Sequence, residues 1–356
     1  MGTRLAILTG SPGAVLDAVA GALGAAGFTT RHLSLDPSTP DPEPESSADL
    51  LVHLGLRTPR GMDEPRRTAL EVSAARTAAR LARAYQVRRL LHVSTTAVYG
   101  RPRNLPCREG ELKDPRTLLE RIRWRAEQAS WAAFRAGAPL SVLRPALPYG
   151  PTVHTGPVRA LAFLALVNQR RRKVPIFRRG PVAHLVHLAD LARAVVHVAL
   201  HPHDRDVVGH AFNVADEAPL PLAEHLAAAL TVLGYEPGRH LPSWPRLTAS
   251  LLWLFRNVPD RTLLAAVNRR LERGWQRLRA ATGVSAQLTP RVDREVLHWM
   301  STDHYYDTSR LRGLGWRARH PVATGAFPET IRTLVEGHFL PAPVGGPRTD
   351  PSAPSG

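Results

Sequence analysis

The chain has 356 residues but only one cysteine, two lysines and few aromatic side chains. The single thiol, Cys107, cannot close an internal disulfide, and it excludes zinc and iron–sulfur sites built from several cysteines. No apolar stretch approaches the ~20 residues that a transmembrane helix needs, the most apolar late stretch being Leu251–Phe255. Because the N-terminus also lacks the pattern of a signal peptide, we expect a cytoplasmic protein.

Acidic residues are scarce as well. The chain carries 30 acidic against 47 basic residues, a net charge of +17, and nearly all of the positive charge is arginine, since Lys113 and Lys173 are the only lysines. A basic excess can indicate a nucleic-acid or anionic-membrane partner. Arginines scattered among alanines favour a solvated basic surface instead. We therefore predict no specific nucleic-acid partner, while peripheral membrane contact stays open.

Short apolar runs alternate with helical stretches through the first half of the sequence, a pattern typical of strand–helix units around a parallel sheet. We expect strands at Arg4–Leu8, Thr30–Leu35, Leu50–Leu54, Arg89–Ser94 and Leu140–Leu143, and helices at Ala14–Ala26, Glu64–Ala84 and Leu118–Ala136. These elements predict an α/β fold of the Rossmann type, with a doubly wound parallel sheet and a smaller, mostly helical C-terminal substrate domain.

The predicted domain boundaries follow from this pattern. We expect residues 1–150 to form the Rossmann-type domain, to which residues 185–215 return, and residues 151–184 and 216–340 to form a second, substrate or lid region. Residues 341–356 are rich in Pro, Gly and Ser, so we expect a disordered tail there.

A glycine-containing turn follows the first strand, where Gly10-Ser-Pro-Gly13 precedes the first helix. Glycines at such a turn let the backbone approach a pyrophosphate, which then lies at the helix N-terminus. The third glycine of dinucleotide-binding turns is replaced here by Leu16. Asp36 either ends the second strand and accepts the ribose 2′-hydroxyl, which favours NAD over NADP, or is a loop aspartate.

Six stretches of the sequence share their order and spacing with one known family. They are Thr9-Gly-Ser-Pro-Gly13, Asp49-Leu-Leu-Val-His-Leu54, His92-Val-Ser-Thr-Thr-Ala-Val-Tyr-Gly100, Leu143-Arg-Pro-Ala-Leu-Pro-Tyr-Gly-Pro151, His184-Leu-Val-His-Leu-Ala-Asp-Leu-Ala-Arg-Ala194 and Phe212-Asn-Val214. Through them the chain resembles the extended short-chain dehydrogenases/reductases, in the NAD(P)-dependent epimerase/dehydratase and 3β-hydroxysteroid-dehydrogenase-like branch. The resemblance implies NAD or NADP as cofactor, cofactor contacts at Leu54 and Pro145, and a homodimer.

The residues that carry the chemistry in this family are partly missing. There, a tyrosine hydroxyl moves a proton during hydride transfer, a lysine four residues later lowers its pKa, and a serine or threonine binds the same substrate oxygen. Thr95 matches the serine or threonine, but counting back from Glu127 places Leu119 at the tyrosine and Arg123 at the lysine. No Tyr-x-x-x-Lys occurs anywhere in the chain.

Leucine cannot transfer a proton, and arginine stays protonated near neutral pH. Arg123 can still hold the ribose hydroxyls or a phosphate. A second departure from the family lies before Asp49, where the relatives usually have one more strand and helix and this chain has only the proline-rich loop from Pro37 to Ala48.

Candidate substrate residues come from the resemblance and from one apolar stretch. The resemblance puts Tyr149, His154 and His187 toward the substrate. The stretch around Trp253 can pack over an apolar substrate, form an oligomer face or lie at a bilayer surface.

Two further features are better explained by structure than by chemistry. Asp190 precedes a predicted helix, and we expect it to cap that helix. His197 and His201 lie four residues apart, which a metal site allows, but histidines there more often stabilise a helix C-terminus. We predict no metal.

Three functions remain open. The first is a divergent NAD(P)-dependent oxidoreductase that acts on an alcohol or ketone of a small apolar molecule, with Thr95 binding the reacting oxygen. The second is a non-catalytic dinucleotide- or ligand-binding descendant that has lost the Tyr/Lys pair. The third is a basic binder of membrane or nucleic-acid surfaces. We rank them in this order.

Overall fold

The structure is a computed structural model, and it describes residues 4–35, 47–57, 62–168, 173–177, 180–241, 263–293 and 299–342. The chain forms two compact units. The first contains residues 1–148, 184–219 and 304–321, and the second contains residues 149–183, 220–303 and 322–356. Asp36, Trp253 and the tail after residue 342, for which the sequence made predictions, lie outside the described residues.

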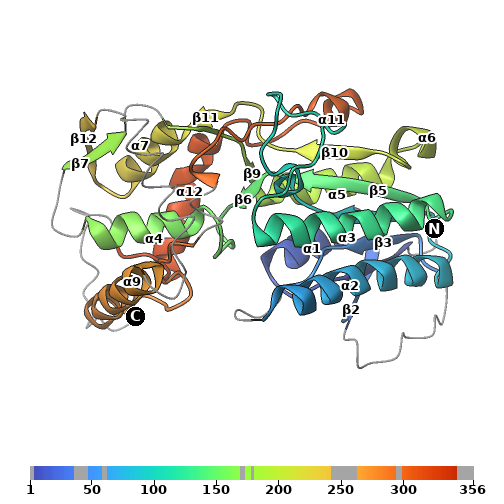
Figure 1. The fold of residues 1–356 in the computed structure, drawn as a ribbon, viewed down its shortest axis with the longest axis horizontal. Coiled ribbons are helices and arrows are strands. Elements are labelled where there is room, and N and C mark those ends of the chain that lie inside the picture. The colour runs from blue at the N-terminus through green and yellow to red at the C-terminus, as the bar shows by residue number, and fades with distance from the viewer. Residues whose placement is uncertain are drawn as a thin grey trace. The chain divides into compact units, whose positions relative to one another are not determined.

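The first unit is built on a six-stranded sheet in which all neighbouring strands run parallel, in the order β10-β5-β4-β3-β1-β2 (Figure 1). The strands are β1 (Arg4–Thr9), β2 (Phe28–Leu33), β3 (Leu50–His53), β4 (Arg89–Val93), β5 (Leu140–Pro145) and β10 (Ala211–Val214). Strands β3, β4 and β5 are buried along their whole length, as expected of a parallel sheet that is covered on both faces. The predicted doubly wound α/β fold is confirmed.

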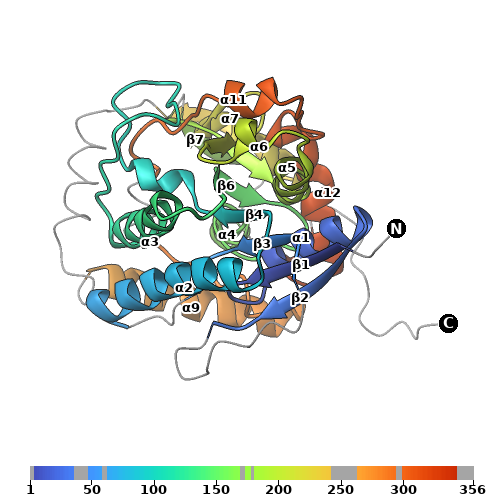
Figure 2. The same ribbon diagram turned by 90° about the vertical axis from the view of Figure 1, so that its right-hand side faces the viewer.

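Two pairs of helices cover this sheet. Helices α2 (Glu64–Ala84) and α3 (Leu118–Arg135) pack side by side, as do α1 (Ala14–Ala25) and α5 (Leu188–Leu200) (Figure 2). Local chemistry fixes their starts: the Asp63 carboxylate accepts the backbone N–H of Arg66, and Thr117 and Glu120 form a capping box at α3. These caps explain why the sequence predicted the first residue of both helices correctly.

The order of the sheet shows the consequence of the short loop before Asp49. Strand β3 pairs directly with β1, with Ala6 beside Leu50 and Thr9 beside His53. The chain therefore moves from β2 at the edge of the sheet to β3 on the other side of β1. In open α/β sheets, ligands bind beyond the carboxyl ends of the strands at such a reversal of strand order.

Two predicted starts of elements were wrong. Strand β2 begins at Phe28 rather than Thr30, because Gly27, at φ 86°, closes the turn after α1 and Phe28 is already buried. Helix α5 begins at Leu188, and its N-cap is His187, whose Nδ1 accepts the N–H of Ala189. Asp190 is therefore a residue of the first helical turn rather than the cap.

One segment lies outside its predicted region. Residues 304–321 belong to the first unit, although the sequence placed them in the second region. Tyr306 forms a parallel bridge with Cys107, and the Asn213 side chain donates to the carbonyls of Cys107 and Asp307. These bonds hold the segment, with its short helix α11 (Ser309–Gly313), against β10.

The remaining short elements of the first unit are the 3-10 helix η1 (Thr96–Tyr99), helix α6 (Asp204–Val207) and strand β9 (Leu185–His187). Strand β9 pairs with β6 (Leu147–Tyr149), where the chain passes between the units.

The second unit is mainly helical, with α4 (Val158–Val167), α7 (Leu222–Val232), α9 (Leu263–Thr282) and α12 (Ala323–Glu336). Two strand pairs complete its described part: β7 (Lys173–Phe177) with β12 (Glu236–Leu241), and β8 (Val182–Ala183) with β11 (Leu220–Pro221). Across the described ranges of both units, no helix is both long enough and apolar enough to span a bilayer.

Candidate functional site

The candidate site lies where the loops after β1 and β3 meet. The N–H of Ser11 donates to the carbonyl of Gly55 at 3.1 Å, and the N–H of Arg57 donates to the Ser11 hydroxyl at 2.8 Å. The N–H of Leu54 donates to the carbonyl of Thr9 at 2.8 Å. These bonds join the two loops at the strand-order reversal, where a ligand is expected in this fold.

Gly10 is required by this close approach. It has a φ of 133°, and a methyl group at its Cα would lie 2.7 Å from the carbonyl oxygen of Gly55 and 3.1 Å from Cβ of Leu54. Any larger residue would push the two loops apart. The predicted cofactor residues Gly10 and Leu54 are therefore in direct contact.

Gly13 is the N-cap of α1 and has a φ of 147°. No side chain caps this helix end, so the first N–H groups of α1 are left for a ligand or water. The space that a side chain at Gly13 would fill is bounded by the guanidinium of Arg57, with Nη1 at 3.2 Å from the Cβ position. A cation beside a helix N-terminus is unfavourable unless an anion joins it. This cradle therefore fits a pyrophosphate, and sequence reasoning had not included Arg57.

Arg123 lies on the other side of the same loop. Its guanidinium donates to the carboxylate of Glu71 on α2 and to the carbonyl of Leu56, each at 3.1 Å. A methyl group on Gly55, which has a φ of 71°, would collide with this guanidinium. Burial raises the pKa of Glu71, and Arg123 opposes that shift. The residue at the family's lysine position thus clamps α2, α3 and the β3 loop together.

The residues at the family's serine/threonine and tyrosine positions lie at the N-cap of η1 and in α3. The hydroxyl oxygen of Thr95 caps η1 by accepting the N–H of Ala97 at 3.2 Å, which leaves its hydrogen able to donate to a bound oxygen. Leu119 is half-buried in the first turn of α3. Pro145 is buried at the end of β5, next to Val214.

The most specific family motifs meet in a buried polar network behind Thr95. Glu127 of α3 pairs with Arg144 of β5 at 2.6 Å and also accepts from Ser94. The Tyr99 hydroxyl donates to Asn213 and accepts from Arg144, at 2.7 and 2.8 Å. This network joins β5 and β10 to the middle of α3 and to the segment Ser94–Tyr99 that follows β4.

Tyr99 does not replace the missing tyrosine. It is fully buried, and both sides of its hydroxyl are occupied by Arg144 and Asn213. Burial raises its pKa well above the ordinary value, which disfavours the phenolate.

The predicted substrate residues fall in different units. Tyr149 and His154 belong to the second unit, where Tyr149 packs edge-on against Phe327 and His154 stacks at 4.0 Å on Phe339. His187 belongs to the first unit and stacks on His320 at 3.8 Å.

Three metal-ligating side chains do come together, namely His187, Asp190 and His320, with their candidate ligand atoms within 4.8 Å. The Asp190 carboxylate already accepts four hydrogen bonds: from the Arg193 side chain, from the N–H groups of Arg319 and His320, and from the His320 ring. It also lies in the first turn of α5, near that helix's positive end. Asp190 therefore holds the 304–321 segment against α5 through hydrogen bonds. A cation at this position would have to displace the guanidinium of Arg193.

Two buried histidines, one on β3 and one on β4, should make the stability of the protein depend on pH. His53 contacts Thr9 at 3.1 Å, and His92 contacts Ser130 at 2.6 Å. Burial lowers the pKa of His92 from 6.5 to about 4 and lowers that of His53 well below its usual range. As the pH falls below 6.5 the unfolded chain takes up protons first, so stability falls down to about pH 4.

For His92 alone we expect a loss on the order of 3 kcal/mol in the free energy of unfolding across this window. Urea unfolding at stepwise pH measures it. His92→Gln should flatten the dependence, and the exposed-site control His203→Gln should keep it. An equal slope in all three proteins would contradict the assignment.

Comparisons with known proteins agree with this architecture. The model of the NAD dependent epimerase/dehydratase family matches residues 41–215. A short-chain dehydrogenase/reductase superfamily protein from Agrobacterium tumefaciens, with bound NAD, is 18% identical with a TM-score of 0.62, covering 94% of this chain and 98% of that one. No curated protein matches the chain.

Two further solved structures share the fold. A UDP-galactose 4-epimerase is 15% identical with a TM-score of 0.62, covering 94% of this chain and 99% of the other. The terminal R domain of the myxalamid biosynthetic pathway is 17% identical with a TM-score of 0.66, covering 96% and 93%. Residues 41–215 thus match the NAD dependent epimerase/dehydratase family, and the chain shares its fold with these solved short-chain dehydrogenase/reductase and epimerase structures.

Proposed function

We propose that this protein binds NAD(H) or NADP(H) beyond the carboxyl ends of β1 and β3 and acts as an oxidoreductase on an alcohol or ketone. The observation that carries the proposal is the cradle at Gly13, where the uncapped N-terminus of α1 and the Arg57 guanidinium border one space. Both features attract a diphosphate. The bound NAD of the Agrobacterium tumefaciens protein supports the same ligand class.

The chain's own residues divide the work as follows. Gly10 and Gly13 let the pyrophosphate approach the backbone, and Arg57 neutralises part of its charge. A bound nicotinamide would supply the hydride acceptor or donor. The Thr95 hydroxyl holds the reacting substrate oxygen by donating a hydrogen bond, and the proton that Leu119 cannot carry passes through water.

The substrate we propose is a small apolar molecule. In this superfamily, nucleotide-sugar enzymes commonly place a phosphate-binding arginine where this chain has Ala183, and Ala183 is buried in β8. That residue cannot bind a phosphate. Asp36, by its position after β2 in the sequence, favours NAD over NADP.

A second candidate function rests on Arg123. Its bonds to Glu71 and Leu56 commit the guanidinium to the protein's own packing. Because the residue at the family's lysine position serves packing rather than proton transfer, the site is consistent with a protein that binds a dinucleotide without turning over a substrate. Both candidates require the same cradle and differ in what Thr95 does.

Thr95→Val separates the two candidates. If the protein is an oxidoreductase, the variant should lower kcat about 100-fold to 1000-fold on a panel of alcohols and ketones. Dinucleotide affinity should change little, because the hydroxyl bonds the substrate rather than the cofactor. Steady-state kinetics and calorimetry measure the two quantities. Thr29→Val, at an exposed position of β2, is the matched control. Dinucleotide binding without any turnover by the wild-type protein would favour the non-catalytic function.

A further inference from the structure

The loop that follows β3 is held at two consecutive peptide groups, Gly55–Leu56 and Leu56–Arg57. In each group the carbonyl and the N–H point to opposite sides, because the peptide bond is planar and trans. On one side both groups are held by Ser11, whose N–H donates to the carbonyl of Gly55 and whose hydroxyl accepts the N–H of Arg57. Ser11 therefore accounts for one polar atom of each peptide group.

The ion pair formed by Glu71 and Arg123 holds the same two peptide groups on the other side. The N–H of Leu56 donates to the Glu71 carboxylate at 3.2 Å. The guanidinium of Arg123 donates to the carbonyl of Leu56 and to Glu71, each at 3.1 Å. Both peptide groups are therefore fixed on both sides, by one residue of the β1 loop and by two residues of α2 and α3.

An arginine suits position 123 better than a lysine in this arrangement. Its planar guanidinium presents two nitrogen atoms side by side, so Nη1 can bond Glu71 while Nη2 bonds the carbonyl of Leu56. A lysine ammonium is a compact point charge and lacks this fork. Gly55 leaves the space for the guanidinium, because a methyl group at its Cα would collide with Nη1 of Arg123. These residues therefore fit one another, although they lie far apart in the sequence.

The orientation of the two peptide groups matters because Arg57 carries the second of them. Its side chain is exposed, and on a free loop it would sample many directions. In the structure its Nη1 lies 3.2 Å from the Cβ position of Gly13, at the uncapped N-terminus of α1. A binding group that is already held in place loses less conformational entropy when its ligand arrives.

We infer that Arg123 and Glu71 are positioning residues for the diphosphate of the dinucleotide, and that they act on it through Arg57. The inference rests on the proposed function, since it requires a dinucleotide in the cradle at Gly13. Opening the ion pair would leave the Glu71 carboxylate, whose side chain is 3% exposed, without its partner. The closed pair therefore keeps the loop in one shape, and Arg123 contributes to binding of the cofactor.

A double-mutant cycle on dinucleotide affinity tests this indirect role. The full chain and its variants are titrated by calorimetry with NAD⁺, NADH, NADP⁺ and NADPH, and the tightest ligand of the wild type is followed. Arg57→Gln should weaken its binding about thirtyfold, and Glu71→Gln about tenfold. In the protein that already carries Arg57→Gln, adding Glu71→Gln should change the affinity by less than about twofold, because its effect passes through a guanidinium that is gone.

Arg123→Lys is a second variant, which keeps the charge but loses the fork. It should weaken binding about tenfold on its own and by less than about twofold when Arg57→Gln is present. A residue that only stabilises the fold would lower the affinity equally in both backgrounds. Unfolding curves confirm that each variant is folded at the temperature of the titration.

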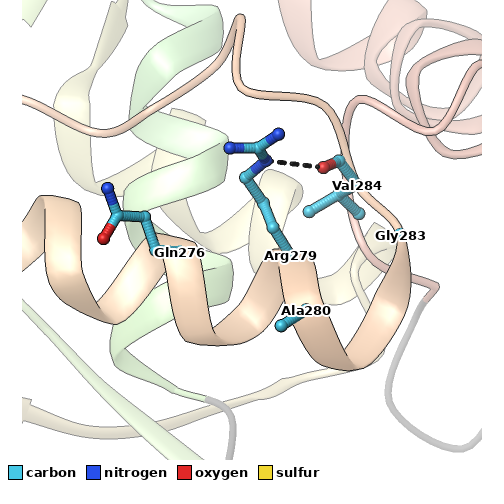
Figure 3. Close-up of a pocket in the computed structure, with 5 residues that line it drawn as sticks. All are labelled: Gln276, Arg279, Ala280, Gly283 and Val284. Atoms are coloured by element: carbon cyan, nitrogen blue, oxygen red, sulfur yellow. Dashed lines mark hydrogen bonds between the residues drawn. The ribbon is translucent and has the colours of Figure 1, made fainter.

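The control arginine belongs to the second unit, at a hollow of about 370 Å³ near the C-terminal end of α9 (Figure 3). The hollow is lined by Gln276, Arg279, Ala280, Gly283 and Val284. Arg279 is exposed and also donates to a backbone carbonyl, that of Val284, at 3.1 Å. Because an anion could bind this guanidinium instead, Arg279→Gln is the matched control, and it should leave the dinucleotide affinity within about twofold of the wild type.

The inference is overturned if Glu71→Gln leaves the affinity of the wild type unchanged, or if it weakens binding equally with and without Arg57→Gln. It is also overturned if Arg279→Gln weakens binding as much as Arg57→Gln does, since the phosphates would then lie at the hollow. In these cases the dinucleotide still binds, so the proposed function stands. A wild-type chain that binds none of the four dinucleotides would overturn the proposed function together with this inference.

Discussion

Glu127→Ala should destabilise the first unit by about 3 to 5 kcal/mol, the cost of leaving a buried charge without its partner. Glu127 has no exposed surface, and its carboxylate accepts from Arg144, Ser94 and Trp131. Burial alone would raise the pKa of Glu127, but Arg144 and the hydrogen bonds outweigh burial and hold the pKa below its usual range. Removing the carboxylate strands the guanidinium of Arg144, which is 3% exposed.

Urea unfolding at neutral pH measures this loss. The matched control is Glu64→Gln, because Glu64 also pairs with an arginine, Arg121, but both side chains are about two-fifths exposed. Solvent screens that pair, so its loss should cost less than about 1 kcal/mol. Equal effects of the two substitutions would show that burial does not make the Glu127–Arg144 pair more costly to break than the exposed pair.

Gly13→Asp should weaken dinucleotide binding at least about a hundredfold, since juxtaposing like charges costs several kcal/mol. The new carboxylate would occupy the space between the N-terminus of α1 and Arg57, where we place the pyrophosphate. The same carboxylate could also accept hydrogen bonds from the uncapped N–H groups of α1 and form an ion pair with Arg57. It would then make the contacts that the pyrophosphate needs. The fold should survive, because the strain of a side chain at this positive φ costs only about 1 to 3 kcal/mol and is confined to a helix cap.

Gly21→Asp is the control for this experiment. Gly21 lies on the same helix, is exposed, and has no neighbouring atom within 4 Å of the Cβ position. The variant adds the same charge and the same atoms outside the cradle, so its dinucleotide affinity should stay within about threefold of the wild type. If both aspartates weaken binding equally, the charge of the helix rather than the cradle is responsible.

The sequence predicted the sheet and its helices because local signals determine them. Asp63 and Thr117 mark the starts of α2 and α3, and buried apolar runs mark the strands. The motif residues Tyr99, Glu127 and Arg144 were recognised through the family resemblance. The structure adds the reason for their types, which is one shared buried network.

The features that could not be predicted depend on contacts between distant segments. Nothing near Arg123 in the sequence indicates Glu71, 52 residues away, as its partner. Nor does Arg57, which follows a strand by a few residues, show that it will face Gly13. The return of residues 304–321 to the first unit likewise depends on Cys107 and Asn213, which lie far away in the chain.

The pair formed by Arg123 and Glu71 also changes how the missing chemistry should be restored. Leu119→Tyr with Arg123→Lys alone would leave the buried Glu71 carboxylate without its guanidinium. Restoring a Tyr/Lys pair therefore needs Glu71→Gln in the same protein. If activity rises only in the triple variant, the Arg123–Glu71 ion pair has taken the place of the lysine and must be removed before a lysine can act at position 123.

The central claim is that the cradle between β1 and β3 binds a dinucleotide, and titration calorimetry of the unmodified chain tests it most directly. NAD⁺, NADH, NADP⁺ and NADPH are titrated separately, with AMP as a fragment that lacks the diphosphate. We predict saturable binding of at least one dinucleotide, at one site per chain, and much weaker binding of AMP. The absence of binding by all four dinucleotides at millimolar concentration would contradict the account.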